Sequence, residues 1–228
     1  VLVDIGGGTT DIAVFAEGSI KHTAVIALGG NHLTSDIAIG LRTPATEAEK
    51  IKKKYGCALA SMVKRDEMIE VPSVGGRKPR TVSRQILAEI VEPRVEEIMT
   101  LVNREIIKAG FEDVAASGVV LTGGSASLDG MIEMAEQVFN LPVRLGLPVG
   151  ISGLTDIVKS PMYSTGVGLL LYGYKNRSED KFRVGEKNVF GKITKRMKEW
   201  LSEFFYWFDK LTMNGNKPFA LSLSKGGS

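Results

Sequence analysis

Residues 1–15 read Val1-Leu2-Val3-Asp4-Ile5-Gly6-Gly7-Gly8-Thr9-Thr10-Asp11-Ile12-Ala13-Val14-Phe15. This stretch predicts a buried strand, a turn of glycines and threonines, and a second strand. Consecutive glycines let backbone N–H groups point into one concavity, free of Cβ atoms, which suits a phosphate. Thr9 and Thr10 add hydroxyl donors beside it. Asp4, at the end of the first strand, is placed to hold a hydrated Mg²⁺ rather than to touch phosphate.

A glycine-rich hairpin without a ligand is the simpler interpretation of the glycines alone. The flanking carboxylates of Asp4 and Asp11 favour a phosphate site, because a plain hairpin requires neither. The stretch is not a Walker A loop or a dinucleotide fingerprint. No Lys-Ser/Thr follows the glycines, and the second flank is strand-like where those motifs need a helix.

Composition indicates an ordinary soluble globular chain, with 43% hydrophobic and 24% charged residues among 228. The net charge of +3 is too small to argue for nucleic acid, and we expect no such partner. The single cysteine, Cys57, excludes an internal disulfide and fits a reducing cytosol. No apolar run is long enough to cross a membrane. The chain starts in mid-strand without Met, so we expect an N-terminal part of the protein to be missing.

The following segments alternate between strand and helix patterns. A third strand, 23–27, predicts an antiparallel meander, and Asn31 is the expected cap of the next helix. Thr43-Pro44 begins a second helix. Glu49 and Lys52 share one face of this helix, where they could address a ribose and its base. The Lys-rich run 50–54 is otherwise a solvated helix face.

The second half repeats the alternation. After a hairpin within 67–82, a long helical pattern runs to residue 109, and Pro93 should kink or divide it. A strand, Gly123-Gly124-Ser125 and a helix start then form a close-approach site for a flat or anionic ligand. Gly-Gly also serves plain loop geometry, so this signal is weak alone. A last core helix is expected at 165–174. The pattern predicts an α/β core with helices on both faces of a sheet.

Residues 188–211 form a second informative stretch. At about 100° per residue, aromatic and aliphatic side chains fall on one arc and lysines opposite, which is typical of a helix lying in a membrane interface rich in anionic lipid. A helix packed on its own domain is the alternative, but the polar linker 175–187 argues against it. The proposed membrane-binding residues are Phe190, Ile193, Met197, Trp200, Leu201 and Phe204, with Lys192 and Lys195.

Several motifs together resemble the actin-like ATPase superfamily. Residues 4–11 resemble its second phosphate loop, 122–125 its adenosine motif, and 48–52 the helix that meets the nucleotide. Within the superfamily the chain resembles the FtsA family of bacterial cell-division proteins. The signs are Gly29-Gly30-Asn31-His32-Leu33-Thr34, Ile90-Val91-Glu92-Pro93-Arg94 and the run 160–170. The likeness covers residues 1–174, and the amphipathic helix also fits.

The resemblance implies a fold and a domain plan. The fold would be an α/β actin-like (ribonuclease H-like) ATPase lobe with a small α+β insertion subdomain and a C-terminal amphipathic helix. This would be the C-terminal half of such a protein, with half of the phosphate contacts upstream of Val1. The expected parts are subdomain IIA at 1–44 and 111–174, subdomain IIB at 45–110, a linker at 175–187, the membrane-targeting helix at 188–211 and a disordered tail at 212–228.

The resemblance also implies a function. ATP with Mg²⁺ would be the ligand, Asp4 would order the metal through water, and the protein would polymerise and tether the FtsZ ring to the cytoplasmic face of the membrane at the septum. Arg94 and Glu97 would contact the FtsZ C-terminal tail. The expected nucleotide-binding residues are Asp4, Gly6, Gly7, Gly8, Thr9, Thr10, Glu49, Lys52, Gly123, Gly124 and Ser125. No residue is a convincing general base, so turnover should be slow at most, and the fragment alone should bind nucleotide weakly.

Two other classes remain open at this point. A sugar kinase or chaperone ATPase would share the phosphate loop, but it has no reason to end in a lipid-seeking helix. An actin-like scaffold for pilus assembly or cell shape would share both the nucleotide site and the membrane helix.

Overall fold

The computed structural model of the chain describes residues 1–73, 75, 77–111, 117–151 and 158–176. The chain divides into two compact units, Val1–Tyr174 and Lys175–Ser228. The predicted membrane helix 188–211 and the tail 212–228 lie outside the described residues, as does most of the linker 175–187. The architecture below is therefore that of the first unit.

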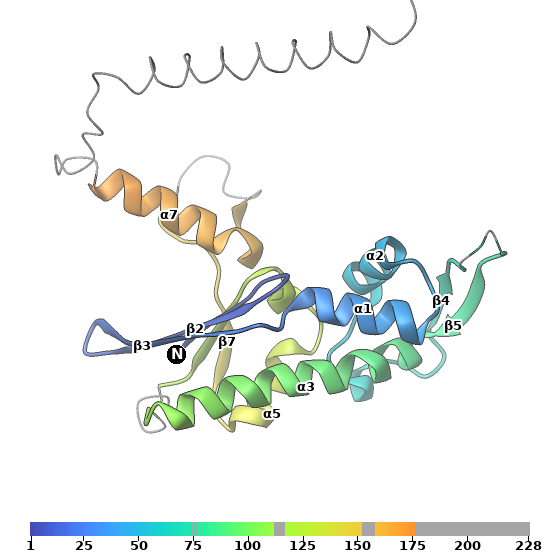
Figure 1. The fold of residues 1–228 in the computed structure, drawn as a ribbon, viewed down its shortest axis with the longest axis horizontal. Coiled ribbons are helices and arrows are strands. Elements are labelled where there is room, and N and C mark those ends of the chain that lie inside the picture. The colour runs from blue at the N-terminus through green and yellow to red at the C-terminus, as the bar shows by residue number, and fades with distance from the viewer. Residues whose placement is uncertain (74, 76, 112–116, 152–157, 177–228) are drawn as a thin grey trace, which may run out of the picture. The chain divides into compact units, whose positions relative to one another are not determined.

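A five-stranded sheet with the order β3-β2-β1-β6-β7 forms the centre of this unit (Figure 1). The first three strands pair antiparallel in sequence, which confirms the predicted meander. β6 then pairs parallel with β1, and β7 parallel with β6. The strands are β1 (Leu2–Ile5), β2 (Thr10–Ala16), β3 (Ser19–Ile26), β6 (Val119–Thr122) and β7 (Val143–Leu145).

The pleat of the sheet separates a buried face from a more open one. Val3, Ile5, Ile12 and Val14 are buried on the side where α3 (Arg84–Lys108) and α5 (Met131–Phe139) pack. α7 (Ser164–Lys175) lies on the opposite side (Figure 1). Alternate residues of each strand point to opposite faces of the sheet. Helices lie on both of these faces, which confirms the predicted α/β class.

Further helices extend from one end of the sheet. α1 (Gly30–Gly40) follows β3, α2 (Ala45–Tyr55) packs against it, and the small hairpin of β4 (Met68–Val71) and β5 (Arg80–Ser83) lies beyond. Three short 3₁₀ helices complete the described elements: η1 (Ala60–Met62), η2 (Gly124–Ser127) and η3 (Pro161–Tyr163). One hydrophobic core runs from the sheet to the hairpin. The division of residues 1–174 into two subdomains stays a prediction.

Three local predictions need correction. α3 is one continuous helix, so Pro93, which is exposed, does not divide it, and the alternative of a kink stays a prediction. α1 starts after Gly29, and its first N–H groups donate to the glycine loop, so Asn31 is not the cap. α7 forms as a helix, but within the described part of the chain only Val167 of it is buried. Its leucines and tyrosines are largely exposed, Leu170 by 75%.

In the part of the chain that the structure describes, no helix combines the length and the apolar character that crossing a bilayer requires.

Candidate nucleotide-binding site

The loop between β1 and β2 is fixed by its own backbone and by α1. The Gly6 N–H donates to the Thr9 carbonyl at 2.9 Å and closes the turn. The Gly6 and Gly7 carbonyls accept the N–H groups of Gly30 at 2.9 Å and Asn31 at 2.7 Å. Two orphan donors at the helix start are thereby satisfied by the loop.

This arrangement leaves backbone donors for a ligand. Within the described part of the chain, the N–H groups of Gly7 and Gly8 have no protein acceptor. Gly8 is exposed, and a Cβ added to it would meet nothing within 4 Å. A short turn with free N–H groups is the arrangement that binds phosphate oxygens. The free N–H groups of Gly7 and Gly8 are compatible with the predicted phosphate nest, and Gly7 belongs to the lining of a hollow.

Glycine is required where α1 meets the loop. A Cβ at Gly29 would lie 2.7 Å from the Gly6 carbonyl oxygen and 2.8 Å from that of Gly7. A Cβ at Gly30 would lie 2.4 Å from the hydroxyl oxygen of Ser125. The Ser125 hydroxyl in turn donates to the Gly6 carbonyl at 3.1 Å. The glycine loop and the start of α1 thus contact each other through backbone, and the Gly-Gly-Ser motif joins them through the Ser125 hydroxyl.

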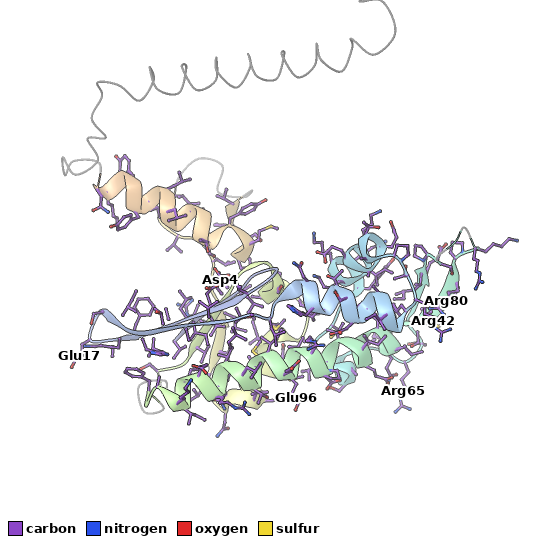
Figure 2. The ribbon with its side chains drawn as sticks, in the orientation of Figure 1. Asp4, Glu17, Arg42, Arg65, Arg80 and Glu96 are labelled. Atoms are coloured by element: carbon purple, nitrogen blue, oxygen red, sulfur yellow. The ribbon has the colours of Figure 1, made fainter. Side chains whose placement is uncertain are left out.

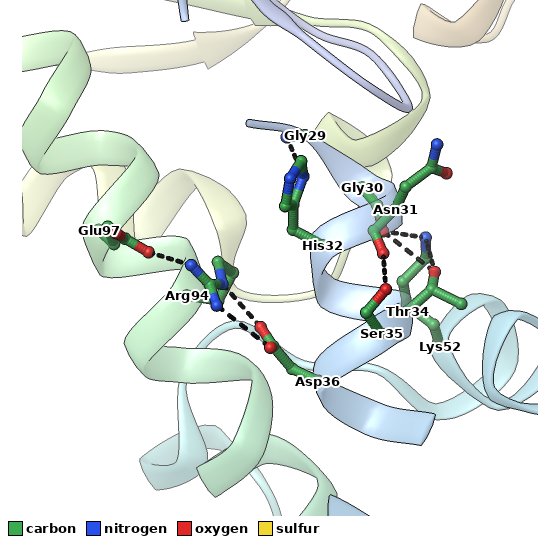
Figure 3. A network of polar contacts seen from close by, with 10 residues as sticks. All are labelled: Gly29, Gly30, Asn31, His32, Thr34, Ser35, Asp36, Lys52, Arg94 and Glu97. Carbon is green, nitrogen blue, oxygen red and sulfur yellow. Dashed lines mark hydrogen bonds and ion pairs between the residues drawn. The ribbon is translucent and has the colours of Figure 1, made fainter. Parts of the chain in front are cut away.

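Lys52 projects from α2 to the same place (Figure 3). Its ammonium donates to the Gly30 carbonyl at 2.8 Å and to the Thr34 hydroxyl at 2.9 Å. It also pairs with Glu49 at 2.7 Å. The Lys52 side chain is only 11% exposed, so these partners compensate the cost of removing its charge from water.

Glu49 completes this network and is held in its charged form. Burial alone would raise the pKa of Glu49. Hydrogen bonds from Lys52 and Thr34, with the charge of Lys52 and a bond from Lys53, outweigh it and lower the pKa below its ordinary value. The pair predicted from its spacing in α2 is therefore a formed ion pair at neutral pH.

The Gly-Gly-Ser motif forms the opposite wall of the hollow. Gly123 has φ +89° and packs so tightly that a Cβ would lie 2.5 Å from the Ile5 carbonyl oxygen. Gly124 faces open space, with Met162 the nearest neighbour of an added Cβ at 3.7 Å. The hollow has a volume of about 360 Å³, which is within the range of small-molecule pockets.

The structure brings together six of the predicted nucleotide-binding residues as lining of this hollow. They are Gly6, Gly7, Glu49, Lys52, Gly124 and Ser125. Gly123 lies behind the wall, and Asp4, Gly8 and Thr9 lie outside the lining. Thr10 is fully buried and its hydroxyl donates to the Leu28 carbonyl at 2.8 Å, so that hydroxyl is not available to a ligand.

Sequence reasoning missed several wall residues. Asn31 and Leu128 line the hollow, together with Met131 and Met162. Thr34 contributes through its bonds to Lys52 and Glu49. The sequence predicted Asn31 only as the cap of the next helix. The methionines gave no signal, because an apolar side chain in a helix is usually core.

The predicted partner residues Arg94 and Glu97 lie away from this hollow, on α3 (Figure 3). The Arg94 guanidinium binds Asp36 of α1 through both carboxylate oxygens, at 2.7 and 3.1 Å, and also pairs with Glu97. The pKa of Arg94 is raised, chiefly by Asp36. These residues line a shallow groove between α1 and α3, here called the Arg94 groove, which comprises Asp36, Ile39, Gly40, Ile90, Pro93, Arg94 and Glu97.

Solved structures place the fold in the actin-like class. MreB 5 of Spiroplasma citri bound to AMPPNP superposes with a TM-score of 0.60 at 22% identity, over 77% of this chain and 53% of that one. A MamK double helical filament gives a TM-score of 0.55 at 18% identity, over 76% of this chain and 53% of that one. At these identities the likeness shows the fold alone.

Sequence relatives identify the family within this class. The family model described as "Cell division protein FtsA" matches residues 1–168. The cell division protein FtsA of Pseudomonas aeruginosa is 50% identical over 210 residues, which are 90% of this chain and 50% of that protein. The chain therefore belongs to the FtsA family of cell division proteins. It spans about half the length of the curated relatives it matches.

Proposed function

We propose that this chain is the part of an actin-like cell-division protein that binds ATP in the hollow between the glycine loop, α2 and η2. The observation that carries the proposal is the convergence of three motifs, distant in sequence, on one hollow in a chain of the FtsA family. The FtsA family match favours this function over a sugar kinase, a chaperone ATPase or a pilus or cell-shape scaffold.

The residues present fit a nucleotide triphosphate. The N–H groups of Gly7 and Gly8 suit the phosphates, and Gly124 leaves room for a flat group to approach the backbone. Glu49 and Lys52 face the hollow from α2, where an exchange of hydrogen bonds with a ribose or base is possible. Turnover would be slow at most, with the nucleotide acting as an assembly switch.

Magnesium also fits, through a single carboxylate. The described residues contain no group of three or more His, Cys, Asp or Glu side chains that could hold a metal ion. Mg²⁺ usually keeps several waters and binds through one or two carboxylates and the substrate phosphates. Asp4 would hold those waters, and the bound ion would neutralise phosphate charge.

Nucleotide binding is tested by filling the hollow. A leucine side chain at Gly124→Leu would enter the open space near Met162, whereas Gly173→Leu is a matched change on exposed α7. Anisotropy of fluorescent ATP with Mg²⁺ should rise on addition of the wild-type chain and of Gly173→Leu, and stay low with Gly124→Leu. Equal binding by all three variants would place the nucleotide elsewhere.

Membrane attachment is proposed from the sequence of 188–211 alone. Its aromatic and aliphatic arc with opposing lysines fits an interfacial helix on anionic lipid. The full chain and a variant ending at residue 211 should sediment with vesicles of phosphatidylglycerol and phosphatidylethanolamine, and a variant ending at residue 187 should not. Equal sedimentation of the last variant would contradict the proposal.

The FtsZ tail is proposed to bind at the Arg94 groove. The groove combines an apolar surface from Ile39 and Pro93 with the charges of Arg94 and Glu97. Charged residues at the edge of an interface steer and orient a peptide, and burial of apolar surface at its centre stabilises the complex. Binding there would place the protein between the FtsZ ring and the cytoplasmic face of the membrane at the septum.

A labelled peptide of the FtsZ C-terminal tail tests this surface. Arg94→Glu should abolish the rise in anisotropy, while Arg144→Glu, an exposed position on β7, should leave it unchanged. Unchanged binding by both variants would exclude the groove. Polymerisation is a separate proposal, and electron microscopy of the longer protein with ATP tests it.

A further inference from the structure

The start of α7 is bonded to the carboxylate that is proposed to hold magnesium. The Thr165 hydroxyl donates to Asp4 Oδ2 at 2.7 Å, between residues 161 positions apart. Figure 2 shows Asp4 at the end of the sheet, facing the beginning of α7. Neither the sequence pattern nor the proposed nucleotide contacts account for this bond.

The other carboxylate oxygen of Asp4 is also confined. A Cβ at Gly123 would lie 2.3 Å from Asp4 Oδ1, so the carboxylate rests directly on the Gly123 backbone. Thr165 on one oxygen and Gly123 on the other thus restrict the rotation of the carboxylate about its χ angles. A group that must present fixed oxygens to metal-bound waters benefits from such a restriction.

A neighbouring contact fixes the start of α7 itself. Thr122 is the parallel register partner of Asp4, so both side chains lie on the same face of the sheet. The buried Thr122 hydroxyl donates to the Ser164 hydroxyl at 2.6 Å, and the Gly123 N–H donates to the Pro161 carbonyl at 3.2 Å. Two adjacent strand ends therefore bind two adjacent residues of α7.

We infer that Thr165 is a positioning residue for the magnesium complex of a nucleoside triphosphate, acting through Asp4. This inference rests on the proposed function. An ionised carboxylate has about four acceptor sites. Asp4 can thus accept the Thr165 hydroxyl and metal-bound waters at the same time. The first turn of α7 belongs to the nucleotide site, and bound magnesium restrains it.

A purely structural role of the bond is the competing explanation. A carboxylate near a helix start stabilises that helix whether or not metal binds. The two roles differ in their magnesium dependence. A structural bond changes stability alone, while a positioning bond changes the Mg²⁺ concentration needed for tight nucleotide binding.

The test measures binding of fluorescent ATP to the full chain as MgCl₂ is titrated from an EDTA baseline. Thr165→Val should raise the Mg²⁺ concentration at half-saturation about tenfold, the lower end for loss of a partner of a metal-binding group. Binding without magnesium should stay within about twofold of wild type, since the ATP–backbone contacts remain. Thr165→Ser keeps the hydroxyl and should restore the wild-type value, and Thr23→Val on exposed β3 is the matched control.

The outcomes separate the two proposals. If wild type binds ATP in a magnesium-dependent way and Thr165→Val needs the same Mg²⁺ concentration for half-saturation, the role of Thr165 is overturned. The proposed nucleotide site would remain supported. Absence of any ATP binding by wild type would overturn the nucleotide site and this inference with it. If Thr165→Val folds poorly, hydrogen exchange of the wild-type chain provides a second test. Mg²⁺-ATP should slow the exchange of the α7 amides more than ATP with EDTA does. Equal exchange rates under the two conditions would contradict the inference.

Discussion

The nucleotide hollow and the Arg94 groove share helix α1 as a wall, yet they are built differently. Gly30 and Asn31 of α1 line the hollow, and Asp36 and Ile39 line the groove. The hollow depends on close backbone contacts at its glycines, and its cation, Lys52, is almost buried. The groove depends on side chains, with its cation 28% exposed. The difference indicates that the hollow tolerates little change, while the groove can adapt to a partner.

Glycine substitution should give the largest contrast between the two regions. Gly123→Ala should lower the free energy of unfolding by at least about 3 kcal/mol, because φ is positive and the Cβ meets backbone. A Cβ at Gly40 in the groove would meet side-chain atoms of Ile90, with Cδ1 nearest at 2.7 Å and Cγ1 at 3.1 Å, and no backbone atom as close, so Gly40→Ala should change stability by less than about 1 kcal/mol. Urea unfolding followed by circular dichroism measures both. Similar losses would contradict the comparison.

Removal of the buried cation should have the next largest effect. Lys52→Met should lower the free energy of unfolding by about 2 kcal/mol, since Glu49 and the Gly30 carbonyl lose a charged donor. Lys50→Met is the matched control on the same helix, where the side chain is 73% exposed, and should cost less than about 0.5 kcal/mol. The same unfolding experiment applies, and equal costs would show that the Lys52 network adds nothing.

The corresponding change in the groove should be smaller. Asp36→Asn should lower the free energy of unfolding by about 1 kcal/mol, because the two-point contact with Arg94 weakens in a partly solvated place. A double-mutant cycle with Arg94→Gln measures the coupling directly, and the exposed Asp66→Asn is the control. A coupling larger than that of Lys52 with Glu49 would reverse the comparison.

Acid should affect the hollow through Glu49. The folded-state pKa of Glu49 lies below its ordinary value of 4.5, so its contribution to stability is fully present above about pH 4.5. That contribution is lost as the pH falls through the lowered pKa. The stability difference between wild type and Glu49→Gln should therefore shrink below about pH 4.5. A difference that stays constant down to pH 2 would show that the pKa of Glu49 is the same in the folded and unfolded states.

The sequence predicted the fold well where the signal is local. The Gly6–Gly8 run with its flanking strands and the 23–27 strand predicted the meander, because turn residues and alternation act over a few positions. It erred on α7 as a core helix, where the outcome depends on which face of a helix meets other residues. Leucine-rich helices are usually core, and only the packing shows that Leu170 is not covered by the described residues.

The candidate site shows the same limit. Glu49 and Lys52 were predictable because their spacing puts them on one helical face. The Thr165 bond to Asp4 was not, since it joins opposite ends of the described chain and requires the parallel pairing of β1 with β6. Thr10 was assigned to the ligand by its position beside the glycines, yet strand alternation turns its side chain into the core.

That parallel pairing also sets an order of folding events. β1, β2 and β3 are consecutive in the sequence, so their pairing closes only short loops. Leu2 pairs with Val120, and this pairing closes a long loop that contains the intervening helices. Distant pairings carry a larger loop-closure entropy and form more slowly. In pulsed hydrogen exchange during refolding, the amides of β2 and β3 should gain protection before those of β6. The nucleotide site, which needs both strand ends, would then be the last part of the unit to be completed.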